Sequence, residues 1–223
     1  GLVLVLMERR VAAWMQIRLG PNRVGPFGLM QSMADTLKLL VKEGMTPDGA
    51  DKFLFNLAPF IAMMVAMLLM APIAFAKGFQ LWDMNIGVLY ISAVSSIMVI
   101  SILMAGWASN NKYSLMGAMR SGAQIVSYEL SAGLSILTIV VLTGSLNITD
   151  IINAQADGWW IFKGHIPVII SFVIFIIAVT AETNRAPFDL AEAESELTAG
   201  FHTEYSGMKF ALFFLAEYIN VFI

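Results

Sequence analysis

Long apolar runs alternate with short polar stretches along most of this 223-residue chain. A helix needs about 20 residues to cross a bilayer, and four runs come close to that length: residues 53–76, 86–108, 123–143 and 165–181. Two shorter runs, at 1–7 and 208–223, are predicted to be parts of further spans. Because the backbone must satisfy its own hydrogen bonds in lipid, this pattern predicts an all-α, polytopic transmembrane helix bundle. We expect residues 1–223 to form a single transmembrane domain that is an internal piece of a longer protein.

A segment of another kind lies between the first partial span and the first complete one. Its glycine and proline residues between positions 20 and 28 exclude a regular helix there. After them, apolar residues recur at helical spacing, while charged residues occupy the other faces. This pattern predicts an amphipathic helix over about 27–43 that lies in the membrane interface and borders a gap through which a lipid-soluble molecule enters. An ordinary packed surface helix would give the same pattern.

The distribution of lysine and arginine predicts how the bundle is oriented. If the spans alternate in direction, most basic residues fall on one side of the membrane: Arg9, Arg10, Arg18, Arg23, Lys38, Lys42, Lys52, Lys112, Arg120, Arg185 and Lys209. The other side receives Lys77 and Lys163. By the positive-inside rule, the first side faces the cytoplasm of a bacterial inner membrane, or the matrix of a mitochondrial inner membrane. The acidic stretch 182–207 lies on that same side.

Composition supports the membrane assignment and excludes some kinds of cofactor binding by this chain. Hydrophobic residues make up 58% of the chain and charged residues 13%, against about 25% charged in soluble proteins. The chain has no cysteine, so it cannot ligate an iron–sulfur cluster through thiolates. Any electron transfer that it supports must therefore use cofactors held by other subunits. The sequence contains no phosphate-binding glycine loop and no G-x-S-x-G nucleophile motif, and we expect neither a metal ion nor a nucleic acid as ligand.

The stretch 182–207 is crowded with carboxylates. Its acidic residues are Glu182, Asp189, Glu192, Glu194, Glu196 and Glu204. If a helix starts at about Asp189, then Asp189, Glu192 and Glu196 lie on one face, and Glu194 points elsewhere. Arg185 is the single arginine of the stretch, and we expect it to pair with one of these acids. Such a row of carboxylates can carry protons, bind cations or simply face water.

Two further acids lie inside apolar segments. Glu129 falls within the run 123–143, and Glu217 falls within 208–223. A charged residue at the centre of a span costs about 2.5–3.5 kcal/mol, so it usually faces the bundle interior or a wet cavity. Together with the acidic stretch, these two acids predict a route for protons or cations, and a structural ion pair is the alternative for each. His202 is interpreted as an ordinary loop residue.

Four stretches of the sequence carry a family likeness. They are ERRVAAWMQIRLGPNRVGPFGLMQSMADTLKLLVKE, GWASNNKYSLMGAMR, SYEL and ETNRAPFDLAEAESELTAGFHTEYSGMKFALFFLAEY. All four resemble the subunit of respiratory complex I that joins the membrane arm to the peripheral arm. This is the H subunit of bacterial NADH:quinone oxidoreductases and subunit 1 of the mitochondrial enzyme. The family has eight transmembrane helices, so the resemblance implies that this chain covers the end of the first helix through the start of the sixth.

The resemblance implies that the chain couples quinone reduction to proton translocation. In that family the inside loops border a tunnel for the quinone headgroup, and the matching positions here are Glu8, Arg9, Arg18, Asp35 and Lys38. The acids that connect the tunnel to the charged axis of the membrane arm match Glu129, Glu182, Asp189, Glu192, Glu194, Glu204 and Glu217. We add Glu196 to this predicted proton path as a member of the acidic row.

The same resemblance implies the substrate and the partners. The substrate is a quinone, either ubiquinone or menaquinone. Partner subunits are expected to hold FMN and the iron–sulfur clusters, and the expected neighbours are the peripheral-arm subunits of the quinone site, the small membrane subunits and the lipid bilayer. We hypothesise that Glu192 and Glu194 respond first to quinone reduction, because closely spaced carboxylates titrate as a coupled set. Glu129 and Glu217 then pass the effect inward.

Three other functions remain open on the sequence. One is the equivalent subunit of a membrane-bound, hydrogenase-type ion-pumping complex, which shares the acidic pattern but need not bind quinone. A second is a stand-alone transporter, although neither an inverted repeat nor a pair of broken half-helices is evident. A third is a passive membrane anchor whose acids are structural.

Overall fold

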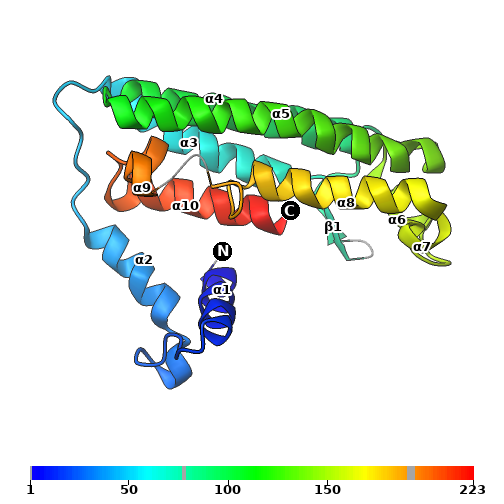
Figure 1. Cartoon of the computed structure of the whole chain (residues 1–223), viewed down its shortest axis with the longest axis horizontal. Helices are drawn as coiled ribbons and strands as arrows, with labels where there is room; N and C mark the ends of the chain where they lie inside the picture. Colours follow the sequence, from blue (N-terminus) through cyan, green and yellow to red (C-terminus); the bar gives the residue numbers. More distant parts are fainter. Residues whose placement is uncertain (1, 77–78, 190–193) are drawn as a thin grey trace.

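The computed structural model describes residues 2–76, 79–189 and 194–223, and in these it shows a bundle of long antiparallel helices (Figure 1). The helices of the bundle are α3 (Lys52–Leu69), α4 (Gly87–Ala108), α5 (Lys112–Thr143), α8 (His165–Glu182) and α10 (Gly207–Phe222). Within the described ranges, the first four of them are long and apolar enough to cross a membrane. The predicted all-α, polytopic bundle is therefore confirmed.

Local sequence signals fix where several of these helices begin and end. The side chain of Asp51 accepts hydrogen bonds from the backbone N–H groups of the first turn of α3, and the side chain of Asn111 caps α5 in the same way. Gly144 ends α5 in a left-handed conformation, with φ 71°, which is the usual role of glycine after a helix. Hydropathy placed α4, α8 and α10 close to their observed bounds.

The core of the bundle lies near the end that carries the acidic stretch. Phe55 of α3 stacks on Tyr205 with ring centroids 4.1 Å apart, and the Tyr205 hydroxyl donates to the backbone oxygen of Phe55. Small residues let α4 and α5 approach closely, because a Cβ atom on Gly106 would lie only 2.3 Å from the Cβ of Ala118. This tight contact leaves α4 and α5 side by side along the bundle (Figure 1).

Helix α5 is longer than the span predicted at 123–143. It has 32 residues, so it extends about 48 Å, well beyond the roughly 30 Å of a hydrocarbon core. Helix α8 ends next to the middle of α5, where the Gln124 amide donates to the backbone oxygen of Ala181 at 2.7 Å. The first turns of α5 therefore project past the end of α8, and the chain that follows α8 packs against them.

The N-terminal elements lie to one side of the long helices of the bundle (Figure 1), and the last of them contacts α10. They are α1 (Leu2–Met15), the 3₁₀ turn η1 (Pro26–Gly28) and α2 (Gln31–Val41). We call them the N-terminal lobe. Helix α1 continues beyond the partial span predicted at 1–7, and α2 lies inside the range 27–43 predicted for the amphipathic helix. Leu37 and Val41 of α2 are exposed apolar residues, as the amphipathic pattern predicts.

The opposite end of the bundle contains short elements that hydropathy did not predict. They are the antiparallel strands β1 (Ala74–Ala76) and β2 (Phe79–Gln80), and the helices α6 (Ile148–Asn153) and α7 (Trp160–Lys163). The span predicted at 53–76 is wrong at its end, because α3 stops at Leu69. Pro72 follows, and its backbone oxygen accepts a hydrogen bond from the Gln80 side chain instead of continuing the helix.

Candidate functional site

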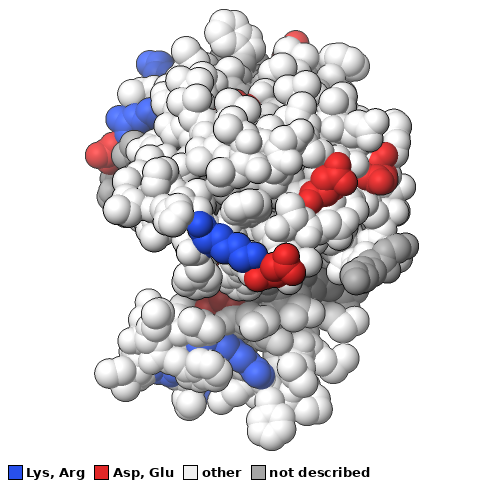
Figure 2. Space-filling view, turned by 90° about the vertical axis from the view of Figure 1, so that its right-hand side faces the viewer, with Lys and Arg blue, Asp and Glu red and all other residues white. Residues whose placement is uncertain are grey.

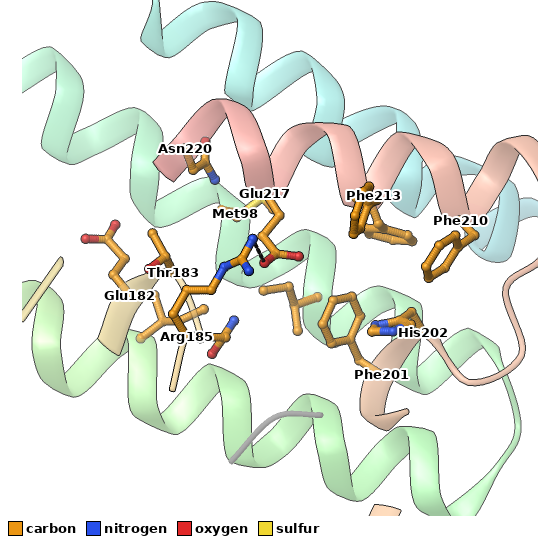
Figure 3. Close-up of a pocket in the computed structure, with 14 residues that line it drawn as sticks. Met98, Glu182, Thr183, Arg185, Phe201, His202, Phe210, Phe213, Glu217 and Asn220 are labelled. Carbon is orange, nitrogen blue, oxygen red and sulfur yellow. Dashed lines mark ion pairs between the residues drawn. The ribbon is translucent and has the colours of Figure 1, made fainter. Parts of the chain in front are cut away.

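Two adjoining cavities open inside the bundle where α8 ends. The first has a volume of about 150 Å³ and lies between the end of α8, the 3₁₀ turn η2 (Gly200–His202), α10, α4 and α5 (Figure 3). The second has a volume of about 300 Å³ and continues from it between α3, α4, α5, α8 and α10. Both cavities are lined by Met98, Ile125, Glu182, Thr183 and Asn220. The two cavities therefore adjoin across these five side chains; we call the pair the hollow and the five shared side chains its neck.

Three of the predicted acids line this hollow. Glu217 lies in the first cavity, Glu182 lies at the neck, and Glu129 lies in the second cavity. The hydroxyl of Ser96 donates to the Glu129 carboxylate. The structure thus brings together acids from α5, α8 and α10 that are far apart in the sequence.

Arg185 lines the first cavity and holds two carboxylates. Its Nη1 lies 2.7 Å from Glu8 of α1, and its Nη2 lies 3.2 Å from Glu217 of α10. Its guanidinium also stacks over the ring of Tyr218 at 4.8 Å, and the Tyr218 hydroxyl donates to Glu8. We call these four residues the Arg185 cluster. The cluster ties the N-terminal lobe to the bundle.

The partners of Arg185 differ from those predicted. We expected it to pair with an acid of the stretch 182–207, but its two ion-pair partners lie on α1 and α10. For Glu217, the structural ion pair that the sequence left open is therefore present. Burial disfavours the charge of Arg185, but the Tyr218 hydroxyl and the carboxylates of Glu217 and Glu8 outweigh it and raise the pKa of Arg185 above its usual value. Arg185 thus stays cationic in the lining of the first cavity.

His202 also lines the first cavity, although the sequence indicated only a loop residue. A close approach positions the turn that carries it, since a Cβ atom on Gly117 of α5 would lie 2.7 Å from the backbone of Gly200. The rings of Phe201 and Phe210 pack against the His202 imidazole. Burial lowers the pKa of His202 to about 4, so the imidazole is neutral at pH 7.

The helical row expected from Asp189 lies partly outside the described residues. Asp189 itself is not helical, and α9 (Glu194–Leu197) is a single turn. Glu192 and the side chain of Glu194 lie outside the described part of the structure. Glu196 pairs with Arg120 on α5 at 2.7 Å, and both side chains are exposed. The predicted row of Asp189, Glu192 and Glu196 therefore stays a prediction.

Other acids of the stretch are placed separately. One carboxylate oxygen of Asp189 is buried without a hydrogen-bond partner among the described residues. Glu204 accepts a hydrogen bond from the Asn111 amide and lines a cleft at the turn between α4 and α5. Across the residues that the structure describes, no group of three histidine, aspartate or glutamate side chains is placed to hold a metal ion.

The residues predicted for the quinone tunnel lie in the N-terminal lobe. Arg9 of α1 pairs with Asp35 of α2 at 2.5 Å, and Arg18 bonds to Gln16 at 2.6 Å. Lys38 is exposed on α2. Glu8 is the member of this set that connects directly to the lining of the hollow, through Arg185. The neighbouring residues Glu8 and Arg9 thus attach α1 to the bundle and to α2 respectively.

Comparison with known proteins identifies the family. The model of the NADH dehydrogenase family matches the whole chain, residues 1–223. The chain belongs to this family. The resemblance carried by the four sequence stretches is therefore confirmed.

Relatives in the NADH dehydrogenase family are close in sequence. The NADH-quinone oxidoreductase H subunit of Bacteroides thetaiotaomicron is 60% identical over the whole chain, which covers 62% of that protein. The H 1 subunit of Koribacter versatilis is 55% identical over 98% of the chain and 53% of that relative. Subunit 8 of the Rhodothermus marinus enzyme is 52% identical over 99% of the chain and 65% of that relative. The chain thus spans about three-fifths of the length of the first of these relatives.

Some lining residues of this NADH dehydrogenase family chain escaped the sequence analysis. Asn220 and Met98 line both cavities, but neither is charged and both lie within apolar runs. For Asn220 a signal was available, since it lies three residues after Glu217 and therefore shares its helix face. For Met98 no pattern in the sequence separates it from the other apolar residues of α4.

Proposed function

We propose that this chain forms the proton-carrying part of a membrane subunit in a proton-pumping NADH:quinone oxidoreductase, and that it borders the quinone site. The observation that carries the proposal is the pair of adjoining cavities along which Glu217, Glu182 and Glu129 lie. Acids inside membrane helices are costly and usually functional, and three of them along one cavity suit a route for protons. The relatives are named as subunits of NADH-quinone oxidoreductase, which agrees with this role.

On this proposal the quinone headgroup approaches between the N-terminal lobe and the bundle. Figure 2 shows an indentation in the molecular surface between these two parts. The exposed apolar side chains of α2 suit the entry of a lipid-soluble substrate, either ubiquinone or menaquinone. Glu8, Arg9, Arg18, Asp35 and Lys38 supply charges around this entrance. A charge change there acts on Glu8, which shares Arg185 with Glu217.

The proton path then runs from the Arg185 cluster to the second cavity. When the charge near Arg185 changes, the proton affinity of Glu217 changes with it, because unit charges at about 4 Å interact by about 4 kcal/mol at an effective dielectric of 20. Glu182 at the neck and Glu129 beyond it form the next steps. Asp189, Glu192, Glu194, Glu196 and Glu204 would supply protons from the inner side. Within this set, we keep the hypothesis that Glu192 and Glu194 respond first.

The proposal also predicts the orientation of the chain in the membrane and its partner subunits. The acidic end would face the cytoplasm of a bacterial inner membrane, or the matrix in a mitochondrion, because the basic residues concentrate there. Peripheral-arm subunits would complete the quinone site and hold FMN and the iron–sulfur clusters, since this chain has no cysteine. Small membrane subunits would continue the path beyond Glu129.

The test uses the full-length subunit in the intact complex, reconstituted in lipid vesicles. Glu129→Gln and Glu182→Gln should each lower the number of protons moved per quinone reduced, because a neutral amide cannot pass a proton on. Asp150→Asn is the matched control, since Asp150 is exposed at the other end of the bundle. If both path variants pump and reduce quinone at wild-type rates, the proposed path is wrong. The double variant Glu192→Gln, Glu194→Gln tests the order of events in the same way.

The hydrogenase-type alternative is distinguished by the partners. It predicts that the chain co-purifies with a hydrogenase module and does not support NADH oxidation by quinone. The relatives are named as quinone oxidoreductases, which favours the quinone enzyme. Purification of the intact assembly, followed by identification of its subunits and bound quinone, separates the two.

A further inference from the structure

The neck between the two cavities has a polar side and an apolar side. Glu182, Thr183 and Asn220 supply the polar side from the end of α8 and from α10. Met98 of α4 and Ile125 of α5 supply the apolar side. These five side chains lie between the acids of the first cavity and Glu129, so we expect water that connects them to pass here. The conformation of the apolar side chains therefore decides whether water connects the two cavities.

Of the two apolar residues, Met98 is the one that can move. Ile125 is 3% exposed, belongs to the main core cluster and is branched at Cβ, which restricts its χ1 rotamers. Met98 is partly buried and packs against both core clusters, the one around Ile102 and the one formed by Val65, Leu69 and Val94. Methionine is unbranched and has three rotatable side-chain bonds, so it adapts to gaps at low cost.

A constriction with an apolar wall can stop protons because it excludes the water along which they move. Hydrophobic constrictions close a path by losing their water, and protons need a chain of hydrogen-bonded groups to cross. Most of the second cavity is apolar, and beyond the neck its polar lining consists of Ser92, Ser95 and Glu129. Water there is held by few partners, and a side chain that fills the neck would break the chain.

We propose that Met98 is a positioning residue that gates the proton path. In one rotamer its thioether fills the neck, and the acids Glu217 and Glu129 are not joined by water. In another rotamer it leaves the neck, and water connects the two cavities through Glu182, Thr183 and Asn220. The inference rests on the proposed function, because it assumes that protons pass from the first cavity to the second.

The test compares two variants of Met98 with a control on the same helix. Met98→Ala removes three heavy atoms and opens space on the order of two water molecules at about 30 Å³ each. Met98→Leu keeps a similar volume of hydrocarbon in the neck. Met104→Ala is the control, because Met104 is a partly buried residue of α4 that packs against the main core cluster and lines neither cavity. All three are measured in the full-length subunit within the intact complex in vesicles.

Two quantities are measured for each variant. One is the passive proton leak under an imposed pH gradient with no quinone present, and the other is the rate of quinone reduction. For Met98→Ala we expect the leak to rise about tenfold because the neck stays wet, while quinone reduction stays within about twofold of wild type. For Met98→Leu and Met104→Ala we expect a leak within about twofold of wild type.

Several outcomes would overturn the gate. A Met98→Ala leak at the wild-type level does so, and so does an equal rise in Met104→Ala, because that result reports general loosening of α4. These outcomes are distinguishable from failure of the proposed function. If Glu129→Gln still abolishes pumping while Met98→Ala has no leak, the path stands and the gate does not. If Glu129→Gln also has no effect on pumping, then both the proposed proton path and the Met98 gate are wrong.

Discussion

Replacing Arg185 by glutamine should loosen the attachment of α1 to the bundle. The guanidinium joins Glu8 of α1 to Glu217 of α10, with distances of 2.7 and 3.2 Å. The most extensive contact of α1 with any other element is with α2, and the Arg185 cluster joins α1 directly to α10. Glutamine keeps part of the length and polarity of arginine but carries no charge, and it cannot bridge two carboxylates.

The magnitude follows from the exposure of the partners. A hydrogen bond to a charged group contributes about 1.5–3 kcal/mol. The side chains of Arg185 and Glu8 are 30% and 46% exposed, so solvent screening places the Glu8 contact toward the low end of this range. A loss of about 1–2 kcal/mol raises the opening equilibrium of α1 by roughly 5–30-fold, since about 1.4 kcal/mol corresponds to a factor of ten.

Amide hydrogen exchange measures this opening directly. In the intact complex in lipid, exchange at residues 9–15 should speed up by the same 5–30-fold in Arg185→Gln. Arg185→Lys should give an intermediate value, because an ammonium group lacks the fork that holds both carboxylates. Arg120→Gln is the control, since its ion pair with Glu196 involves α5 and α9 and not α1.

The reasoning fails if exchange at residues 9–15 is the same in Arg185→Gln and wild type. It also fails if Arg120→Gln produces an equal increase, because the lobe would then respond to any lost charge. In either case a contact other than the Arg185 cluster would hold α1 in place.

Three further predictions concern the surroundings of the hollow. Gly117→Ala should destabilise the protein by about 1–3 kcal/mol, because the new Cβ would lie 2.7 Å from the backbone of Gly200. On the proposed function the same clash should lower the rate of quinone reduction. The thermal unfolding midpoint measures the loss of stability. Burial lowers the folded-state pKa of His202 to about 4, which favours the neutral form. His202 therefore contributes about 3 kcal/mol to the unfolding free energy above pH 6.5, and this contribution is lost as the pH falls from 6.5 toward 4. Arg120→Ala should change the unfolding free energy by at most about 1 kcal/mol, because its pair with Glu196 is exposed.

Each of these predictions has its own check. Gly133 lies on the same helix as Gly117, and nothing lies within 4 Å of a Cβ atom added there, so Gly133→Ala should be neutral or slightly stabilising. A similar loss in both glycine variants would argue against the clash. His202→Gln should flatten the pH dependence of unfolding between pH 6.5 and 4. A loss well above 1 kcal/mol in Arg120→Ala would show that the surface pair matters more than its exposure indicates.

Hydropathy located most of the bundle because apolar runs mark what lies in lipid. It failed at the end of α3, since residues 70–76 are as apolar as the helix before them and only Pro72 indicates the change to a turn and a strand. It also missed the first turns of α5. Residues 112–122 contain charged and polar side chains, and an apolar window does not include a helix that projects beyond the membrane.

The acids of the site could be predicted because a charge inside an apolar run stands out. Their partners could not. Arg185 lies 177 residues from Glu8, and no local spacing links two residues brought together by the packing of α1 against the bundle. The position of Met98 could not be predicted for the same reason. It lies at the neck because of how four helices pack, and not because of its neighbours in sequence.

The mismatch in length between α5 and α8 has an electrical consequence. The hydrogen bond from Gln124 to Ala181 sets the level at which α8 ends, and Glu129 lies five residues deeper along α5. That depth is about 8 Å, or roughly a quarter of a 30 Å hydrocarbon core. On the proposed path, a proton moved from the end of α8 to Glu129 crosses only about a quarter of the transmembrane voltage, which amounts to about 0.6 kcal/mol at 100 mV. Most of the work against the membrane potential must then be done beyond Glu129.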